Sequence, residues 1–177
     1  MKIRSGFVSN SSSSSFVLAF SEKPGSKEEL HELMFGKEER EFHSPWEWNK
    51  YSTSTTNIAE AVFVQLGKQL SLDDILEEFT SGHLDGISLD WNDPSMPDCW
   101  IEDENGNEVY NPKYKEWMDA EGEKEKIRAL EYFNRWNCPD DQVFFRVEFA
   151  DEDGSFGSLC EHGGIFENIH HVQISHH

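Results

Sequence analysis

The beginning of the chain alternates between short apolar and polar segments. Residues 3–8 and 16–20 are rich in valine, leucine, isoleucine and phenylalanine, and we predict a strand at each. Between them lies a serine-rich segment, residues 9–15, which we predict to be a polar loop. Two strands joined by a hydroxyl-rich connection are therefore expected to open the fold.

Apolar residues at helical spacing follow in four segments. Ser26 precedes the first, residues 27–35, and Glu29 three positions later is typical of a capping box. The second begins at residue 56 or 57 and runs to about residue 69. The third, residues 72–79, follows Ser71, which has Asp74 three positions later. The fourth covers residues 113–136, and we expect Gly122 to interrupt it.

Strand patterns occupy much of the remaining sequence. Alternation or short apolar runs predict strands at residues 86–91, 143–149, 155–160 and 172–175. The dipeptide Asn105-Gly106 predicts a hairpin, because both residue types accept the positive φ of a tight turn. Residues 37–56 show neither period and are predicted to be an irregular loop. The expected architecture is α+β, with a mixed or antiparallel sheet packed by about four helices in a single domain over residues 1–177.

Charge narrows the classes of partner. The chain has 35 aspartates and glutamates against 15 lysines and arginines, a net charge of −20. Such a charge repels phosphate backbones and anionic bilayers, so we expect neither direct nucleic-acid binding nor membrane association. It favours a protein partner with a basic surface, including the case in which the chain imitates a nucleic acid. The alternative is that the acidic surface only maintains solubility.

The three cysteines, Cys99, Cys138 and Cys160, form no CxxC pair. Their odd number argues against a disulfide framework, and we expect free thiols. The sequence has no run of about 18 apolar residues, and its first residues lead into serines rather than into the apolar core of a signal peptide. We therefore expect a protein of the reducing cytosol.

The N-terminal sequence, Met1 to Phe16, is MKIRSGFVSNSSSSSF. It resembles an N-terminal signature of uncharacterised proteins from tailed bacteriophages and their bacterial hosts, in which the signature precedes otherwise dissimilar chains. The resemblance implies a phage or prophage accessory origin and a bacterial host cytosol. It carries over no catalytic residue.

Two segments are candidate binding sites. Hydroxyls and backbone amides of a serine loop suit anion binding or phosphorylation, against the alternative of ordinary turn hydrogen bonds; the residues are Ser11, Ser12, Ser13, Ser14 and Ser15. In the 37–56 segment, Trp46, Trp48 and Tyr51 are candidate aromatic anchors for a protein partner. The alternative is that these rings cover the edge of the core.

Metal-ligating residue types concentrate near the C-terminal end. The candidate ligands, which suit zinc or iron, are Cys160, His162, His170, His171, His176 and His177. In a strand over residues 172–175, His170 and His176 fall on one face and His171 and His177 on the other, so neither pair chelates one ion unaided. A site therefore requires Cys160 or His162 to fold back against a terminal histidine; otherwise the histidines are structural.

The chain contains no GxxxxGK[ST], GxGxxG, GxSxG or HExxH motif. The sequence thus gives no ground for nucleotide hydrolysis, dinucleotide binding, serine hydrolase chemistry or a zinc protease, and leaves enzymatic activity open without favouring it. The preferred hypothesis is a phage-type accessory protein that binds another protein through its acidic surface. The alternatives are a small metal-binding protein or metal-dependent enzyme that uses the C-terminal histidines, and a minor virion component.

Overall fold

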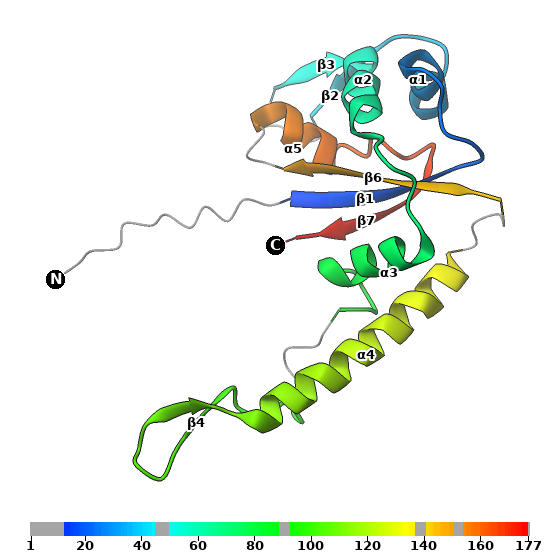
Figure 1. The fold of residues 1–177 in the computed structure, drawn as a ribbon. Helices are drawn as coiled ribbons and strands as arrows, with labels where there is room; N and C mark the ends of the chain where they lie inside the picture. Colours follow the sequence, from blue (N-terminus) through cyan, green and yellow to red (C-terminus); the bar gives the residue numbers. More distant parts are fainter. Residues whose placement is uncertain (1–12, 45–49, 89–92, 137–140, 151–153, 177) are drawn as a thin grey trace. The chain divides into compact units, whose positions relative to one another are not determined.

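The computed structural model describes residues 13–44, 50–88, 93–136, 141–150 and 154–176. Within these ranges the chain forms five helices and seven strands in small sheets, which confirms the α+β class (Figure 1). Contacts group the chain into two compact units, one formed by residues 1–75 and 138–177 and the other by residues 76–137. The single domain over residues 1–177 stays a prediction.

A three-stranded antiparallel sheet forms the centre of the first unit. Strand β1 (Ser13–Phe20) lies between β6 (Val143–Ala150) and β7 (His170–Ser175), with Leu18 opposite Phe145 on one side and His171 on the other (Figure 1). Every residue from Ser14 to Phe20 is buried, so both faces of this central strand are covered.

Three helices pack against one face of this sheet. They are α1 (Lys27–Phe35), α2 (Thr55–Gln65) and α5 (Gly154–His162). The sheet contributes Phe16, Leu18 and Phe20 to the shared core, and the helices contribute residues such as Met34 and Leu159. This apolar cluster is the main source of stability of the unit.

Helix starts follow the capping residues of the sequence. The Ser26 side chain accepts a hydrogen bond from the Glu29 amide, although the Glu29 carboxylate reaches the amide of Gly25 rather than that of Ser26. Helix α3 (Leu72–Ser81) begins with a reciprocal box in which Ser71 and Asp74 bond each other's amides. The Ser71 amide lowers the pKa of Asp74, so this box is formed by the carboxylate.

The second unit contains a long helix and a hairpin. Helix α4 (Pro112–Arg135) follows the two strands β4 (Trp100–Glu102) and β5 (Glu108–Tyr110) directly (Figure 1). Phe79 packs edge-to-face against Tyr132 of α4 and against Trp136, which caps the end of that helix. Gly122 does not interrupt the helix, contrary to our expectation, because a single interior glycine costs only about 1 kcal/mol relative to alanine and side-chain contacts offset that cost.

The strand predicted at residues 155–160 is wrong. This segment lies in α5, which begins at Gly154 with a φ of 75°. Topology explains the difference: β6 and β7 flank β1 and both run antiparallel to it, so they run parallel to one another and need a crossover between them. A short apolar run does not by itself distinguish such a helix from a strand.

Two predicted loops contain strands. Ser13–Ser15, predicted as part of a loop over residues 9–15, form the first residues of β1 because β6 and β7 pair with them. Within residues 37–56, β2 (Glu41–His43) and β3 (Ser52–Ser54) pair as a short antiparallel ladder. These strands are too short for a periodic signal in the sequence.

The strand predicted at residues 86–91 is absent from the part of it that the structure describes. Residues 86–88 form a turn instead, with Gly86 at a φ of 82°. The Ser88 hydroxyl accepts from the Leu84 amide at 2.8 Å, and this local bond favours the turn over an extended strand. Residues 89–92 and the strand predicted at residues 3–8 lie outside the described ranges.

Candidate functional site

The hairpin β4–β5 exposes large apolar side chains on both faces. Trp100 lies opposite Tyr110, and these two side chains are 59% and 45% exposed. The neighbouring pair, Ile101 and Val109, points to the other face and is 41% and 36% exposed. Exposed apolar residues clustered on one projecting element, rather than scattered singly, indicate a binding surface.

Aromatic contacts continue from the hairpin onto α4. The ring centroids of Trp100 and Tyr110 are 5.7 Å apart in an edge-to-face arrangement, and Tyr110 meets Tyr114 at 6.0 Å in the same manner. Tyr114 then stacks with Trp117 at 6.4 Å. These contacts form a continuous series of four aromatic side chains from the hairpin to α4.

The hairpin turn is held by its own carboxylate. Asp103 accepts hydrogen bonds from the amides of Asn105 and Asn107 at 2.8 and 2.9 Å, and Gly106 takes a φ of 78°. The Asn107 amide is the main cause of a lowered pKa at Asp103. This carboxylate therefore serves the turn, as the sequence suggests for an Asn-Gly hairpin.

Asn111 fixes the base of the hairpin to α4. Its side-chain oxygen caps the helix by accepting from the Lys113 amide at 3.0 Å, and its side-chain nitrogen donates to the Asp98 carbonyl at 2.6 Å. Its backbone amide donates to the Cys99 carbonyl at 2.9 Å. One buried residue thus joins the start of α4 to the two residues that precede β4.

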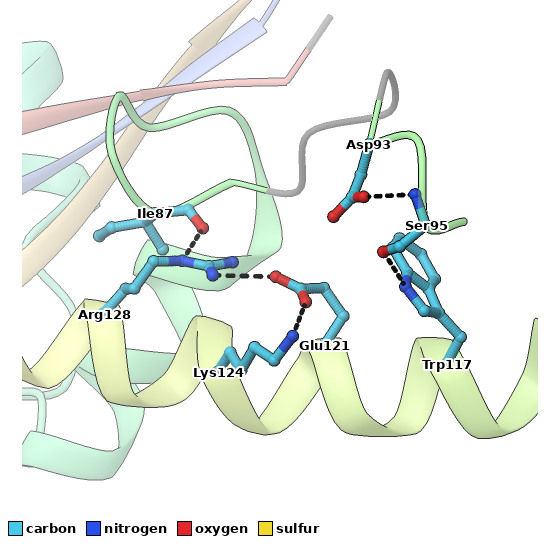
Figure 2. Close-up of polar contacts among 7 residues, drawn as sticks. All are labelled: Ile87, Asp93, Ser95, Trp117, Glu121, Lys124 and Arg128. Atoms are coloured by element: carbon cyan, nitrogen blue, oxygen red, sulfur yellow. Dashed lines mark hydrogen bonds and ion pairs between the residues drawn. The ribbon is translucent and has the colours of Figure 1, made fainter.

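Two further contacts tie the preceding loops to α4, as Figure 2 shows. Trp117 points its indole nitrogen at the Ser95 hydroxyl, at 3.4 Å, and the Ser95 amide donates to Asp93 at 2.7 Å. Arg128 donates to the Ile87 carbonyl at 2.8 Å. The helix is therefore a rigid support for the loops that lead into the hairpin.

A buried carboxylate organises the middle of α4 (Figure 2). Glu121 lies 2.9 Å from both Lys124 and Arg128. The hydrogen bond from Lys124, followed by that from Arg128, lowers the pKa of Glu121. The group is therefore ionised at neutral pH and holds both cations on the helix.

The hairpin itself carries only negative charge. Five carboxylates and no lysine or arginine lie between Asp98 and Tyr110. Elsewhere in the described residues, many cations lie within 4 Å of a carboxylate: Lys27, Lys37, Lys68, Lys115, Lys124, Lys126, Arg128 and Arg146. These pairs neutralise the cations locally, so the surplus carboxylates dominate the surface charge.

The first unit contains a buried polar cluster at the start of β1. Ser14 donates to the Glu161 carboxylate at 3.0 Å, and Gln173 donates to Ser14 at 3.1 Å. His162 lies 3.5 Å from the second carboxylate oxygen of Glu161, whose side chain is fully buried. The cluster joins β1, α5 and β7; its serine and its carboxylate are buried, whereas Gln173 and His162 lie exposed at its edge.

The serine tract does not form an open loop where it is described. Ser15 is fully buried, and its hydroxyl lies 2.9 Å from the His176 ring. Ser14 faces the Glu161 carboxylate, which repels an anion. Ser13 is half-buried in β1, while Ser11 and Ser12 lie outside the described residues, where the anion or modification site stays a prediction.

The candidate metal ligands are distributed over separate surroundings. Cys160 is buried in the core, where desolvation raises the pKa of its thiol to about 12. The Nδ1 of His171 donates to the Ile169 carbonyl at 2.9 Å, and its ring lies beside aromatic rings. Exposed His170 is on the opposite face of β7. Within the described ranges, no three His, Cys, Asp or Glu side chains gather closely enough to hold a metal ion. His177 lies outside those ranges.

The proposed aromatic anchor of residues 46–51 is described only at Tyr51. That side chain is half-buried and packs against the core, as the alternative of a core cover requires. Trp46 and Trp48 lie outside the described residues, so their role stays a prediction.

A surface cavity of about 410 Å³ adjoins α1 and the start of α2. Its lysines are already paired, Lys27 with Glu60 at 2.9 Å and Lys37 with Glu32 at 3.5 Å. A hydrogen bond with Glu60 is the main cause of the raised pKa of Lys27. The cavity thus lacks a net cationic centre for an anionic ligand, and its residues are Lys27, Glu28, His31, Glu32, Lys37, Glu39 and Thr56.

Sequence reasoning missed the hairpin as a surface. The signal is present in the pairs Trp100-Ile101 and Val109-Tyr110, because two adjacent apolar residues in a strand point to opposite faces. An apolar residue on each face of a short hairpin requires either burial on both sides or a partner.

No family model, curated protein or solved structure matches this chain. Across the described ranges, no helix combines the length and the apolar composition that crossing a bilayer requires. The hairpin surface therefore stands on its geometry and charge alone.

Proposed function

We propose that this chain is an accessory protein of phage type that binds a positively charged surface of another protein. The observation that carries the proposal is the exposed hairpin: apolar side chains on both faces, within a segment that carries carboxylates and no cation. The net charge of −20 supports the same kind of partner, because it attracts cationic surfaces at long range. The phage-type origin rests on the resemblance of residues 1–16.

The test is capture by the immobilised full chain from a bacterial lysate at two salt concentrations. Raising salt from about 0.1 M to about 1 M shortens the screening length from about 10 Å to about 3 Å. We expect specific partners at low salt that elute at high salt. Beads that carry polyglutamate of the same total charge serve as the control, and partners retained equally by polyglutamate do not count.

A stricter form of the proposal is that the acidic surface occupies a nucleic-acid-binding groove. In that form, duplex DNA competes for the captured partner, and the partner releases the chain as DNA is added. Capture that is absent, or indifferent to salt, contradicts binding through charge. Capture that DNA does not reverse contradicts the mimic form alone.

A further inference from the structure

One face of the hairpin combines two aromatic rings with two directly opposed carboxylates. Trp100 faces Tyr110 across the two strands, and Glu102 faces Glu108 one step nearer the turn on the same side. All four side chains are exposed. We call this set the hairpin face.

The opposed glutamates are unfavourable for the isolated chain. Directly paired residues of an antiparallel ladder have Cβ atoms roughly 4.5–5.5 Å apart, and like charges at that separation repel. No ion pair to either carboxylate is found among the described residues, and the hairpin segment contains no lysine or arginine. A cation placed between Glu102 and Glu108 relieves this repulsion and gains two charge-assisted hydrogen bonds.

The neighbouring rings suit the same cation. Trp100 and Tyr110 meet edge-to-face at an interplanar angle of 81°, and they are 59% and 45% exposed, so both rings are accessible to a cation. A guanidinium group stacks on an aromatic face and binds carboxylates through a planar fork, whereas an ammonium group does neither as well. The hairpin face is thus better matched to arginine than to lysine.

Charge also decides what kind of molecule covers this face. A second copy of the chain brings another net −20 and another hairpin without cations, so self-association through this face is repulsive. A nucleic acid is repelled for the same reason. We infer that the hairpin face binds arginine side chains of a basic segment of a partner protein, an inference that rests on the proposed function and specifies its partner.

The base of the hairpin supports this role by holding the face in place. Asn111 joins the start of α4 to the segment just before β4 through bonds to Lys113 and Asp98, and Tyr114 packs against Tyr110 from α4. A face that is already ordered loses less entropy when it binds.

The experiment measures binding of short dye-labelled peptides to the full chain by fluorescence anisotropy. One peptide alternates arginine with serine and its counterpart alternates lysine with serine. We expect the arginine peptide to bind more tightly, and the double substitution Glu102→Gln/Glu108→Gln to weaken its binding about tenfold. Trp100→Ala weakens it by about threefold to fivefold.

The matched control removes two exposed carboxylates elsewhere in the second unit, by Glu77→Gln/Glu131→Gln, and should reduce binding by less than about twofold. A stability measurement separates binding from folding: the hairpin substitution removes the like-charge pair, so it should raise thermal stability while it weakens binding. That opposite response is not expected of a merely unfolded variant.

Equal losses from the hairpin pair and the control pair overturn the hairpin inference and leave binding through general acidic charge intact. Failure of the wild-type chain to bind the arginine peptide at about 0.1 M salt also overturns it, while the lysate capture still decides the proposed function. Tighter binding of the lysine peptide refutes the choice of arginine.

Discussion

Asn111→Ala should loosen the hairpin from α4 by an amount that its hydrogen bonds define. The substitution removes the helix cap to the Lys113 amide, worth about 1 kcal/mol, and the bond to the Asp98 carbonyl, worth about 1 kcal/mol net. The two bonds together are worth about 2 kcal/mol, and one substitution removes both because they come from the same buried side chain. Asn111→Ser keeps a capping oxygen and loses only the donor to the Asp98 carbonyl, so it should cost about half as much.

Hydrogen exchange followed by mass spectrometry measures this effect on peptides that cover β4, β5 and the start of α4. In Asn111→Ala, hairpin amides should exchange up to about thirtyfold faster, as 2 kcal/mol predicts. Amides of β1, in the other compact unit, are the internal control and should not change. Exchange of the hairpin at the wild-type rate in Asn111→Ala refutes the view that this residue holds the face in place. An equal effect of Asn111→Ser contradicts the share of the energy assigned to the helix cap.

The remaining predictions concern the two cores. The bonds from Lys124 and then Arg128 lower the pKa of Glu121 below the ordinary value of 4.5 for a glutamate, so its contribution to stability is present above that pH and is lost as pH falls through the folded pKa. The melting-temperature difference between wild type and Glu121→Gln should therefore shrink from pH 7 to pH 3. Cys160, with a thiol pKa of about 12, should resist alkylation at pH 8 in the folded protein and react after denaturation, as peptide mass mapping will show. Leu18→Ala, at a fully buried position in the central strand, should cost about 2–5 kcal/mol in urea unfolding, and a loss below about 1 kcal/mol contradicts the packing described for it.

Local signals in the sequence predict the elements that depend on neighbours along the chain. The helix caps predicted at Ser26 and at Ser71 with Asp74 are correct, and so is the hairpin predicted at Asn105-Gly106. A cap or a tight turn is decided within about four residues, so a local signal suffices. The strand at residues 143–149 is likewise recovered, since its alternation matches a sheet with one face toward the helices.

Elements that depend on topology are not predictable in this way. The α5 segment contains two glycines, which lower its helix propensity, whereas the need to cross from β6 to β7 favours a helix there. Ser13–Ser15 are polar, yet β1 continues through them because two partner strands satisfy their backbone and Glu161 and His176 satisfy two of their hydroxyls. These partners are more than a hundred residues away in the sequence, outside any local window.

The candidate site residues show the same difference between local signals and features that depend on topology. The histidines stand out in the sequence because they are close together along it, but alternation in β7 places neighbouring histidines on opposite faces. The hairpin face has no such density. It becomes visible only when the register places Glu102 opposite Glu108 and Trp100 opposite Tyr110.

Salt distinguishes the two electrostatic contributions at this face. Attraction of a distant basic partner acts over more than the screening length of about 10 Å at 0.1 M salt, and is therefore already weakened there. Repulsion between Glu102 and Glu108 acts over roughly 5 Å and persists until the screening length approaches about 3 Å near 1 M. Moderate salt should thus slow association with a basic partner before it stabilises the hairpin, and only high salt should do both.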